Sequence, residues 1–362
     1  MKEFNRTFSF QFKYEVPNSI KALQRKNLPP SSKLKFIKRK IYLNFKRQRH
    51  LEIKNILPLH KNILWINISA PSLGDSLMDL SSRAMLDDRK IDLYTHKKNV
   101  SLYLHDSFFN SVFCNLNQVK EEKYDLVIID SFSTRSVNLK EKIAPLAPFV
   151  GMFGFYNGPE VNRVLFSFHQ MNYLLGNVFE ETKINDIARP SIFISNEDLV
   201  FIKSLKLPKD FIAIAIGGVW NFRTFNNWEF VIEKLVDQNK KRKIILVGSE
   251  NGIAEAKRIV ESISSDVVMN LVAKLSFNQT AEVINKAKYT VCCDGGLMHA
   301  ANSVGAIVVP LLAKLDSDMQ LTNANKSFSL YDKLNVNNIS IKNIISKCQE
   351  ASNFSDSHPQ DE

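Results

Sequence analysis

A polar turn between two apolar runs is the first place in this sequence where chemistry could occur. The segment "YTVCCDGGLMHAANSVGAIVVPLL" (289–312) sets Asp294, Gly295, Gly296 and His299 between stretches that read as buried strands. A helix beginning after the glycines would aim its free N–H groups and positive dipole end at an anion. Glycines let backbone approach such a ligand closely, and His299 could hydrogen-bond a phosphate or sugar oxygen. The pattern predicts a diphosphate site; a plain strand–helix turn capped by Asp294 is the alternative.

The elements that would position this turn form two series of alternating strands and helices. The predicted strands cover 62–68, 90–96, 124–131 and 147–156 in the first series, and 211–218, 243–250, a short run near 267–272, 289–293 and 306–312 in the second. Such alternation indicates parallel β-α-β units, so we expect an α/β protein with two Rossmann-like domains.

Polar clusters at 71–76, 217–223, 248–250 and 294–299 each follow a predicted strand. Ligands of doubly wound sheets bind outside the carboxyl ends of the strands. We therefore expect the two domains to face a cleft that these clusters line.

The length of 362 residues and the 44% hydrophobic content suit two soluble domains. We predict a basic N-terminal arm (1–61), a first domain (62–200), a second domain (201–345) and a flexible polar tail (346–362). The junction is placed near "ARPSIFISNEDL".

The positive charge of the chain is concentrated in the arm. Residues 1–61 hold 16 of the 48 basic residues and 3 of the 37 acidic ones, for a net charge of +13, whereas the remainder carries −2. Within the arm, "SSKLKFIKRKIYLNFKRQRH" (31–50) interleaves Lys and Arg with large apolar residues. This pattern suits a helix on an anionic membrane surface, and equally RNA or an acidic partner protein. A solvated helix that covers the body is the remaining interpretation.

Several classes of protein are disfavoured. No stretch approaches the ~20 apolar residues of a membrane helix, and "MKEFNRTFSF" lacks the core of a signal peptide, which favours a cytoplasmic location. The four cysteines show no metal-ligand or disulfide spacing, and adjacent Cys292 and Cys293 read as buried thiols. No G-x-G-x-x-G follows the first strand, which argues against an NAD-dependent dehydrogenase. A nucleotide-sugar epimerase is less favoured, and a nucleic-acid binder would rest on the arm alone.

The order of four motifs resembles glycosyltransferase family 9, the bacterial lipopolysaccharide heptosyltransferases. "DGGLMHAANSVGAIVVPL" fits the family's Asp-Ser/Thr-Gly-x-x-His segment, and "RTFNNWEF" places Arg223 and Phe225 at its Lys and Trp positions. "NLVAKLSFNQTAEVINKAKYTVCCD" (270–294) is similar to the approach to that segment, and "INISAPSLGDSLMDL" to the Gly-Asp turn of the first domain. The resemblance covers about 62–315 and implies the B-type glycosyltransferase architecture.

The resemblance implies a role for each matched residue. Asp75 would be the base that deprotonates the acceptor hydroxyl, with Ser72 and Gly74 beside it on the acceptor side. Arg223 would neutralise the departing diphosphate without a metal, Glu250 would accept hydrogen bonds from the ribose, and Leu275 would offer backbone to the adenine edge. The donor-binding set is Gly218, Arg223, Glu250, Leu275, Asp294, Gly295, Gly296, Met298 and His299. A helix N-cap is the alternative role for Asp75, a surface arginine for Arg223 and a solvated carboxylate for Glu250.

The implied activity is that of an inverting, metal-independent glycosyltransferase without a cofactor. It would move a sugar, heptose from ADP-heptose, onto a lipopolysaccharide or other surface-glycan acceptor, with the arm holding it at the inner membrane.

Three departures from the family pattern favour a second hypothesis. Gly295 stands at the Ser/Thr position, Arg223 replaces Lys, and "AKLDSDMQL" replaces a Gly-x-Thr-x-Pro loop. A non-catalytic relative that binds nucleotide or glycan, and a partner through its basic arm, would also fit.

Overall fold

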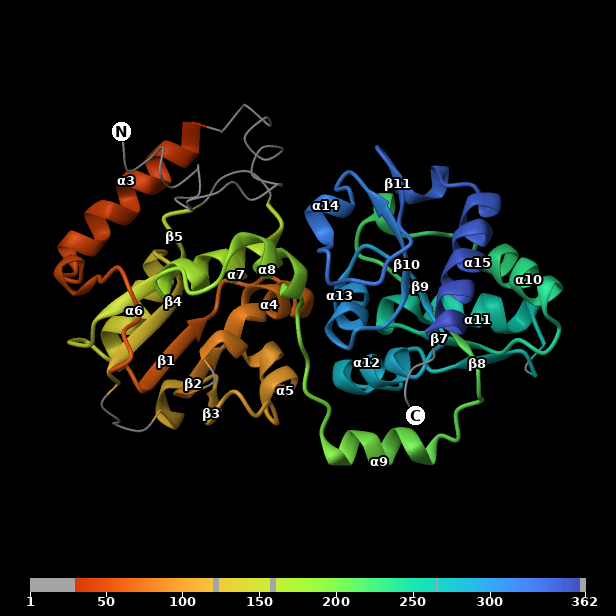
Figure 1. The fold of residues 1–362 in the computed structure, drawn as a ribbon, viewed down its shortest axis with the longest axis horizontal. Coiled ribbons are helices and arrows are strands. Elements are labelled where there is room, and N and C mark those ends of the chain that lie inside the picture. The colour runs from red at the N-terminus through yellow and green to blue at the C-terminus, as the bar shows by residue number, and fades with distance from the viewer. Residues whose placement is uncertain (1–29, 87, 120–123, 157–160, 265, 359–362) are drawn as a thin grey trace. The chain divides into compact units, whose positions relative to one another are not determined.

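The computed structural model describes residues 30–86, 88–119, 124–156, 161–264 and 266–358. The chain divides into two compact units that meet between Ala188 and Arg189 (Figure 1). Each unit is built on a parallel sheet, so the predicted α/β class with two Rossmann-like domains is confirmed.

The first unit contains a five-stranded sheet in the order β3-β2-β1-β4-β5. Its strands are β1 (Asn62–Asn67), β2 (Lys90–Thr95), β3 (Ser111–Phe113), β4 (Leu126–Ser131) and β5 (Phe149–Gly154). Its helices are α3 (Pro30–Phe45), α4 (Leu73–Asp79), α5 (Val100–Tyr103), α6 (Thr134–Ile143), α7 (Arg163–Leu174) and α8 (Glu181–Ile187). The run "NILWIN" forms a central strand because its aliphatic side chains are buried on both faces of the sheet.

The second unit contains a six-stranded sheet in the order β11-β10-β9-β6-β7-β8. Its strands are β6 (Ile212–Ala215), β7 (Ile244–Val247), β8 (Val268–Asn270), β9 (Thr290–Cys293), β10 (Val308–Ala313) and β11 (Leu330–Asp332). Its helices are α9 (Asn196–Ser204), α10 (Trp228–Gln238), α11 (Ile253–Ser262), α12 (Phe277–Asn285), α13 (Gly296–Ser303), α14 (Ser317–Gln320) and α15 (Ile341–Ser357).

Each sheet has one point where the chain reverses its direction of growth. In the first unit this point lies between β1 and β4, and in the second between β6 and β9. Such a switch point opens a crevice at the carboxyl ends of the two strands, which is where ligands of these folds bind.

Two predicted boundaries differ from the structure. The division falls after Ala188 rather than after residue 200, because α9 packs beside α12 and Asn278 of α12 donates to the carbonyl of Phe193 (2.9 Å). The flexible tail is wrong for residues 346–357, which continue α15. Cys348 and Ala351 are buried in the core of the second unit at helical spacing, and this packing orders the segment.

The described part of the arm belongs to the first unit. Residues 1–29 lie outside the described residues, whereas α3 packs against the sheet through the fully buried Leu43. The expected covering helix is therefore present. No helix within the described ranges is long and apolar enough to cross a membrane.

Candidate functional site

Arg223 and Asp294 meet at the switch point of the second unit. Arg223 ends the 3₁₀ turn Asn221–Arg223 that follows β6, and Asp294 follows β9 directly. The Arg223 Nη1 lies 2.8 Å from Asp294 Oδ2, and the Asp294 side chain is only 2% exposed. A buried carboxylate needs such a partner, so Asp294 fixes the arginine at the crevice. The Arg223 Nε is buried and has no hydrogen-bond partner among the described residues, whereas the Arg223 side chain as a whole is 28% exposed.

A second cation lies beside this arginine. Lys314, which directly follows β10, places its Nζ 3.8 Å from the centroid of the Phe222 ring. The Arg223 guanidinium also lies over that ring, at 5.3 Å. The ring therefore holds two positive charges together at one edge of the sheet, where an anion would be favoured. Lys314 was not among the predicted site residues.

Gly295 and Gly296 lead from β9 into α13. The Gly295 backbone is extended (φ 167°), a conformation open to any residue, and a Cβ added to it would meet no atom within 4 Å. Steric crowding therefore does not explain why Gly295 stands where the family pattern has a Ser or Thr hydroxyl. The helix begins at Gly296, and its first turn supplies the N–H groups expected for an anion.

Met298 and His299 are turned into the protein. Met298 is fully buried, and His299 is 4% exposed. The contact between His299 and a phosphate or sugar stays a prediction, since this side chain packs in the interior.

The remaining donor-side residues lie on neighbouring loops of the same edge. An added Cβ on Gly218 would come within 2.1 Å of Thr224 Oγ1, so the Gly218 backbone packs directly on that side chain. Glu250 is exposed and begins a 3₁₀ turn after β7, and Leu275 is half-buried before α12. Ser276 caps α12 in a reciprocal capping box with Gln279.

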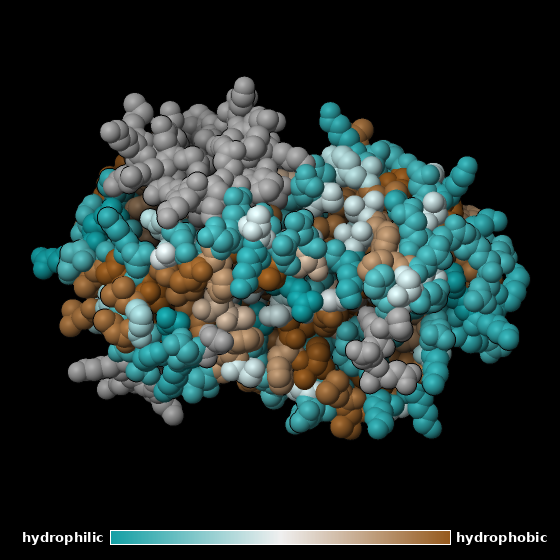
Figure 2. Space-filling view, in the orientation of Figure 1, coloured by the Kyte–Doolittle hydropathy of each residue, from teal (hydrophilic) through white to brown (hydrophobic). Residues whose placement is uncertain are grey.

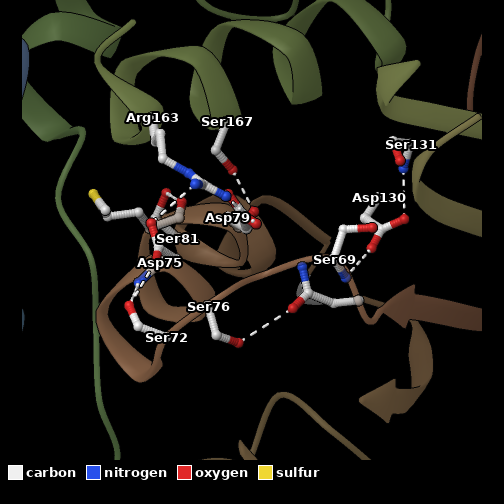
Figure 3. A network of polar contacts seen from close by, with 12 residues as sticks. Ser69, Ser72, Asp75, Ser76, Asp79, Ser81, Asp130, Ser131, Arg163 and Ser167 are labelled. Carbon is white, nitrogen blue, oxygen red and sulfur yellow. Dashed lines mark hydrogen bonds and ion pairs between the residues drawn. The ribbon is translucent and has the colours of Figure 1, made fainter. Parts of the chain in front are cut away.

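Asp75 lies at the switch point of the first unit, in the first turn of α4 (Figure 3). The helix N-cap is Ser72, whose Oγ accepts from the Asp75 backbone N–H (3.2 Å) and donates to Asp75 Oδ2 (2.5 Å). The alternative that Asp75 is the N-cap is therefore wrong. Gly74 is buried in the same turn. A partly exposed carboxylate at a strand end, held by a hydroxyl, is suited to accept a proton.

Arg163 and Asp79 complete a network that sequence reasoning missed. Arg163, the first residue of α7, donates from Nη1 to Asp75 Oδ1 (2.9 Å) and from Nε and Nη2 to Asp79 Oδ1 (2.9 and 2.6 Å), as Figure 3 shows. Asp79 is 3% exposed, and burial raises its pKa to about 6 although Arg163 opposes the shift. The i, i+4 spacing of Asp75 and Asp79 could have indicated one helix face. Nothing local in the sequence indicates Arg163.

Asp130 fastens the loop that carries this network. At the end of β4, its carboxylate accepts from the backbone N–H of Ile68 (2.9 Å), Ser69 (2.7 Å) and Ser131 (2.6 Å), and from the Ser136 hydroxyl (2.6 Å). The contacts with Ser69 and Ser131 are visible in Figure 3. Because Asp130 joins the carboxyl ends of β1 and β4, it fixes the start of the loop that leads to Asp75.

Among the described residues, metal ligands are not gathered at the carboxyl edge of either sheet. Within the ranges that the structure describes, no group of three or more His, Cys, Asp or Glu side chains is arranged to hold a metal ion.

Two doubly wound units, one with cations at a helix N-terminus and one with a held carboxylate, have the folds of a two-domain glycosyltransferase. Residues 181–353 match the model of glycosyltransferase family 9 (heptosyltransferase). The matched segment spans most of the second unit, and it is the family that the motifs resemble.

Solved structures agree with this fold at low sequence identity. A family 9 glycosyl transferase from Veillonella parvula is similar with a TM-score of 0.68 at 15% identity, covering 83% of this chain and 100% of its own. The ADP-heptose lipopolysaccharide heptosyltransferase II of E. coli gives 0.65 at 16% identity, with 82% and 100% covered. An E. coli heptosyltransferase with ADP-2-deoxy-2-fluoro heptose gives 0.54 at 15%, with 80% and 99% covered. No curated protein matches the chain in sequence.

Proposed function

We propose that this protein transfers a heptose from an ADP-linked donor to a lipopolysaccharide-type acceptor, with inversion at the anomeric carbon. The observation that carries the proposal is the Asp75 carboxylate, held at a strand end by Ser72 and Arg163. ADP-heptose is the donor named for one similar structure, and an ADP-linked heptose is bound in another.

The reaction is a single displacement. Asp75 takes the proton of the acceptor hydroxyl while that oxygen attacks the anomeric carbon of the donor. The bond between the anomeric carbon and the diphosphate oxygen breaks, and the diphosphate leaves with its electron pair. Attack opposite the leaving group inverts the anomeric centre.

The leaving group is neutralised by protein groups of the second unit. Arg223 presents a guanidinium on a side chain that is 28% exposed, and the first turn of α13 presents backbone N–H groups. This arrangement stabilises the charge that develops on the diphosphate without a metal ion. We therefore expect turnover to persist in excess EDTA.

The test is Asp75→Asn. We expect kcat to fall by roughly 10²- to 10⁴-fold, the usual contribution of a general base, while calorimetry gives an unchanged Kd for ADP. Asp88→Asn is the matched control, since Asp88 is a 57% exposed carboxylate of the same unit that pairs with Lys61. A kcat near that of the wild type in Asp75→Asn would remove Asp75 as the base.

The alternative is a non-catalytic relative, which Gly295 and the absent Gly-x-Thr-x-Pro loop favour. It would bind ADP and ADP-sugars in calorimetry and show no turnover with a broad panel of acceptors.

We also propose that the protein works in the cytoplasm, at the inner face of the membrane where such acceptors are anchored.

A further inference from the structure

The outer face of α3 carries a stripe of large apolar side chains. Leu34, Ile37, Ile41 and Phe45 are 51–77% exposed. At roughly 100° per residue they fall within an arc of about 80° along the helix. Single exposed apolar residues are common, but four in register form a continuous surface. Figure 2 shows a gathering of hydrophobic residues, in brown, on the visible face of the first unit.

The opposite face of α3 is already occupied by the protein. Phe36 and Leu43 are buried, and the ring of Phe36 lies 5.0 Å from that of Phe155. Lys46, just after the helix, pairs with Glu141 of α6 (2.8 Å). The core of the unit therefore accounts for one face of α3 and leaves the stripe unexplained.

Lysines flank the stripe on both sides. Lys35 and Lys38 lie beside the stripe on one side of the helix, and Lys40 lies on the other side. The side chains of Lys35 and Lys38 are exposed. Long basic side chains beside an apolar stripe place their charges at the level of lipid headgroups while the apolar groups enter the acyl boundary. RNA would be bound by the lysines without use for the stripe, and an anionic bilayer uses both.

We propose that the α3 face formed by Leu34, Ile37, Ile41 and Phe45, with its flanking lysines, binds the surface of an anionic phospholipid bilayer. The helix is also joined to the site. Arg39 donates from Nη1 to the carbonyls of Phe155 (3.2 Å) and Tyr156 (3.1 Å), just beyond the carboxyl end of β5. This is the sheet edge that carries Asp75, so a bilayer on α3 lies beside the edge that would receive a lipid-linked acceptor. This last step rests on the proposed function.

The experiment is vesicle flotation of the full chain, with phosphatidylglycerol–phosphatidylcholine vesicles against pure phosphatidylcholine. We expect binding to the anionic vesicles that weakens with salt. Ile41→Ser with Phe45→Ser should lower the partition coefficient about tenfold or more, because two apolar side chains no longer enter the lipid. Lys35→Gln with Lys38→Gln should reduce the preference for anionic lipid.

The matched control is Val200→Ser with Leu334→Ser, which removes two similarly exposed apolar side chains (70% and 65%) from the second unit. It should partition as the wild type does, and thermal melting should show all variants folded. Equal partitioning of the α3 serine variant and the wild type would overturn the proposal. So would RNA binding that depends on the lysines and ignores the serine substitutions.

A second measurement separates this inference from the proposed function. With an acceptor embedded in anionic vesicles, the α3 serine variant should lose turnover about in proportion to its lost partitioning. With a delipidated, soluble acceptor it should turn over as the wild type does. Vesicle binding without turnover on either acceptor would refute the transferase mechanism and leave the lipid surface standing, whereas equal turnover on embedded acceptor would refute the coupling.

Discussion

Arg163 shares its guanidinium between two carboxylates with different surroundings. Asp75 is partly open to solvent, whereas Asp79 is buried. The three hydrogen bonds to Asp79 from Nε and Nη2 fix the plane of the guanidinium, so that Nη1 is aimed at Asp75. In the proposed reaction, Arg163 is therefore a positioning residue, and Asp79 acts through it.

The protonation of Asp79 should appear in the pH dependence of kcat. The groups facing Asp79 are Arg163, Asp75 and Asp130, and burial places its pKa at about 6. Raising the pH through about 6 removes the proton, and the full carboxylate then holds Arg163, so kcat rises with pH. Asp79→Asn should abolish this acid limb and lower kcat about tenfold or more at pH 8, the equivalent of one charge-assisted hydrogen bond.

Arg163→Lys provides the matched comparison for Arg163→Gln. Lysine keeps the charge and should retain part of kcat, whereas glutamine should not, and the donor KM should be unchanged in both. An acid limb that persists in Asp79→Asn would show that another group sets it.

Gly295 offers a gain of function. A Cβ there meets open space, so a hydroxyl can be added without displacing neighbours. Gly295→Ser should tighten ADP binding about fivefold, the usual worth of one hydrogen bond, as measured by calorimetry. Gly295→Ala is the control, because it adds the carbon without the hydroxyl. Equal affinities of the two variants would mean that no phosphate lies within reach of residue 295.

At the scale of elements, two aspartates tie β1 to β4 at opposite ends. Asp130 holds the carboxyl ends, and Asp125 accepts from the backbone N–H of Lys61 (3.1 Å) and Asn62 (2.9 Å) at the amino ends. The carboxylate of Asp130 thus joins the two strands beside the candidate site, and that of Asp125 joins them far from it. Substitutions of the two aspartates can therefore distinguish an effect on stability from an effect on activity.

Asp130→Ala should cost about 3 kcal/mol of unfolding free energy, because backbone donors lose a charged acceptor, and should also lower kcat. Asp125→Ala should destabilise the unit and leave kcat unchanged. Urea unfolding with steady-state kinetics checks both variants. A normal kcat in folded Asp130→Ala would show that the loop before Asp75 keeps its place without this clamp.

For the whole molecule, the sequence predicted the sheets better than the contacts between distant elements. The strands around Ile63–Ile66 and Ile244–Val247 could be predicted because unbroken aliphatic runs mark strands buried on both faces. The three-residue edge strands β3 and β11 carry no such run. The polar outer face of α15 concealed the buried spacing of Cys348 and Ala351.

Some residues of the candidate site could be predicted from the sequence, and others could not. Asp75, Arg223 and Asp294 could be found because each follows a strand within a motif of known order. Arg163 could not, because 88 residues separate it from Asp75 and only the packing of α7 against α4 brings them together.

The second unit has its own core, and this predicts that it folds alone. Its sheet is enclosed by α9–α15, and its core clusters lie within residues 189–362. A fragment of residues 189–362 should unfold cooperatively and bind ADP within about threefold of the Kd of the full chain, since each donor contact proposed here lies in it. Circular dichroism and calorimetry test this. A folded fragment that fails to bind ADP would show that the first unit contributes to the nucleotide site.

The hydrogen bonds from Arg39 to the backbone just beyond β5 fix α3 to the first unit. On the bilayer proposed above, α3 would hold the sheet edge that carries Asp75 at a fixed distance from the lipid surface. Acceptor sugars at that distance from the lipid would reach Asp75, and sugars farther out along the glycan would not.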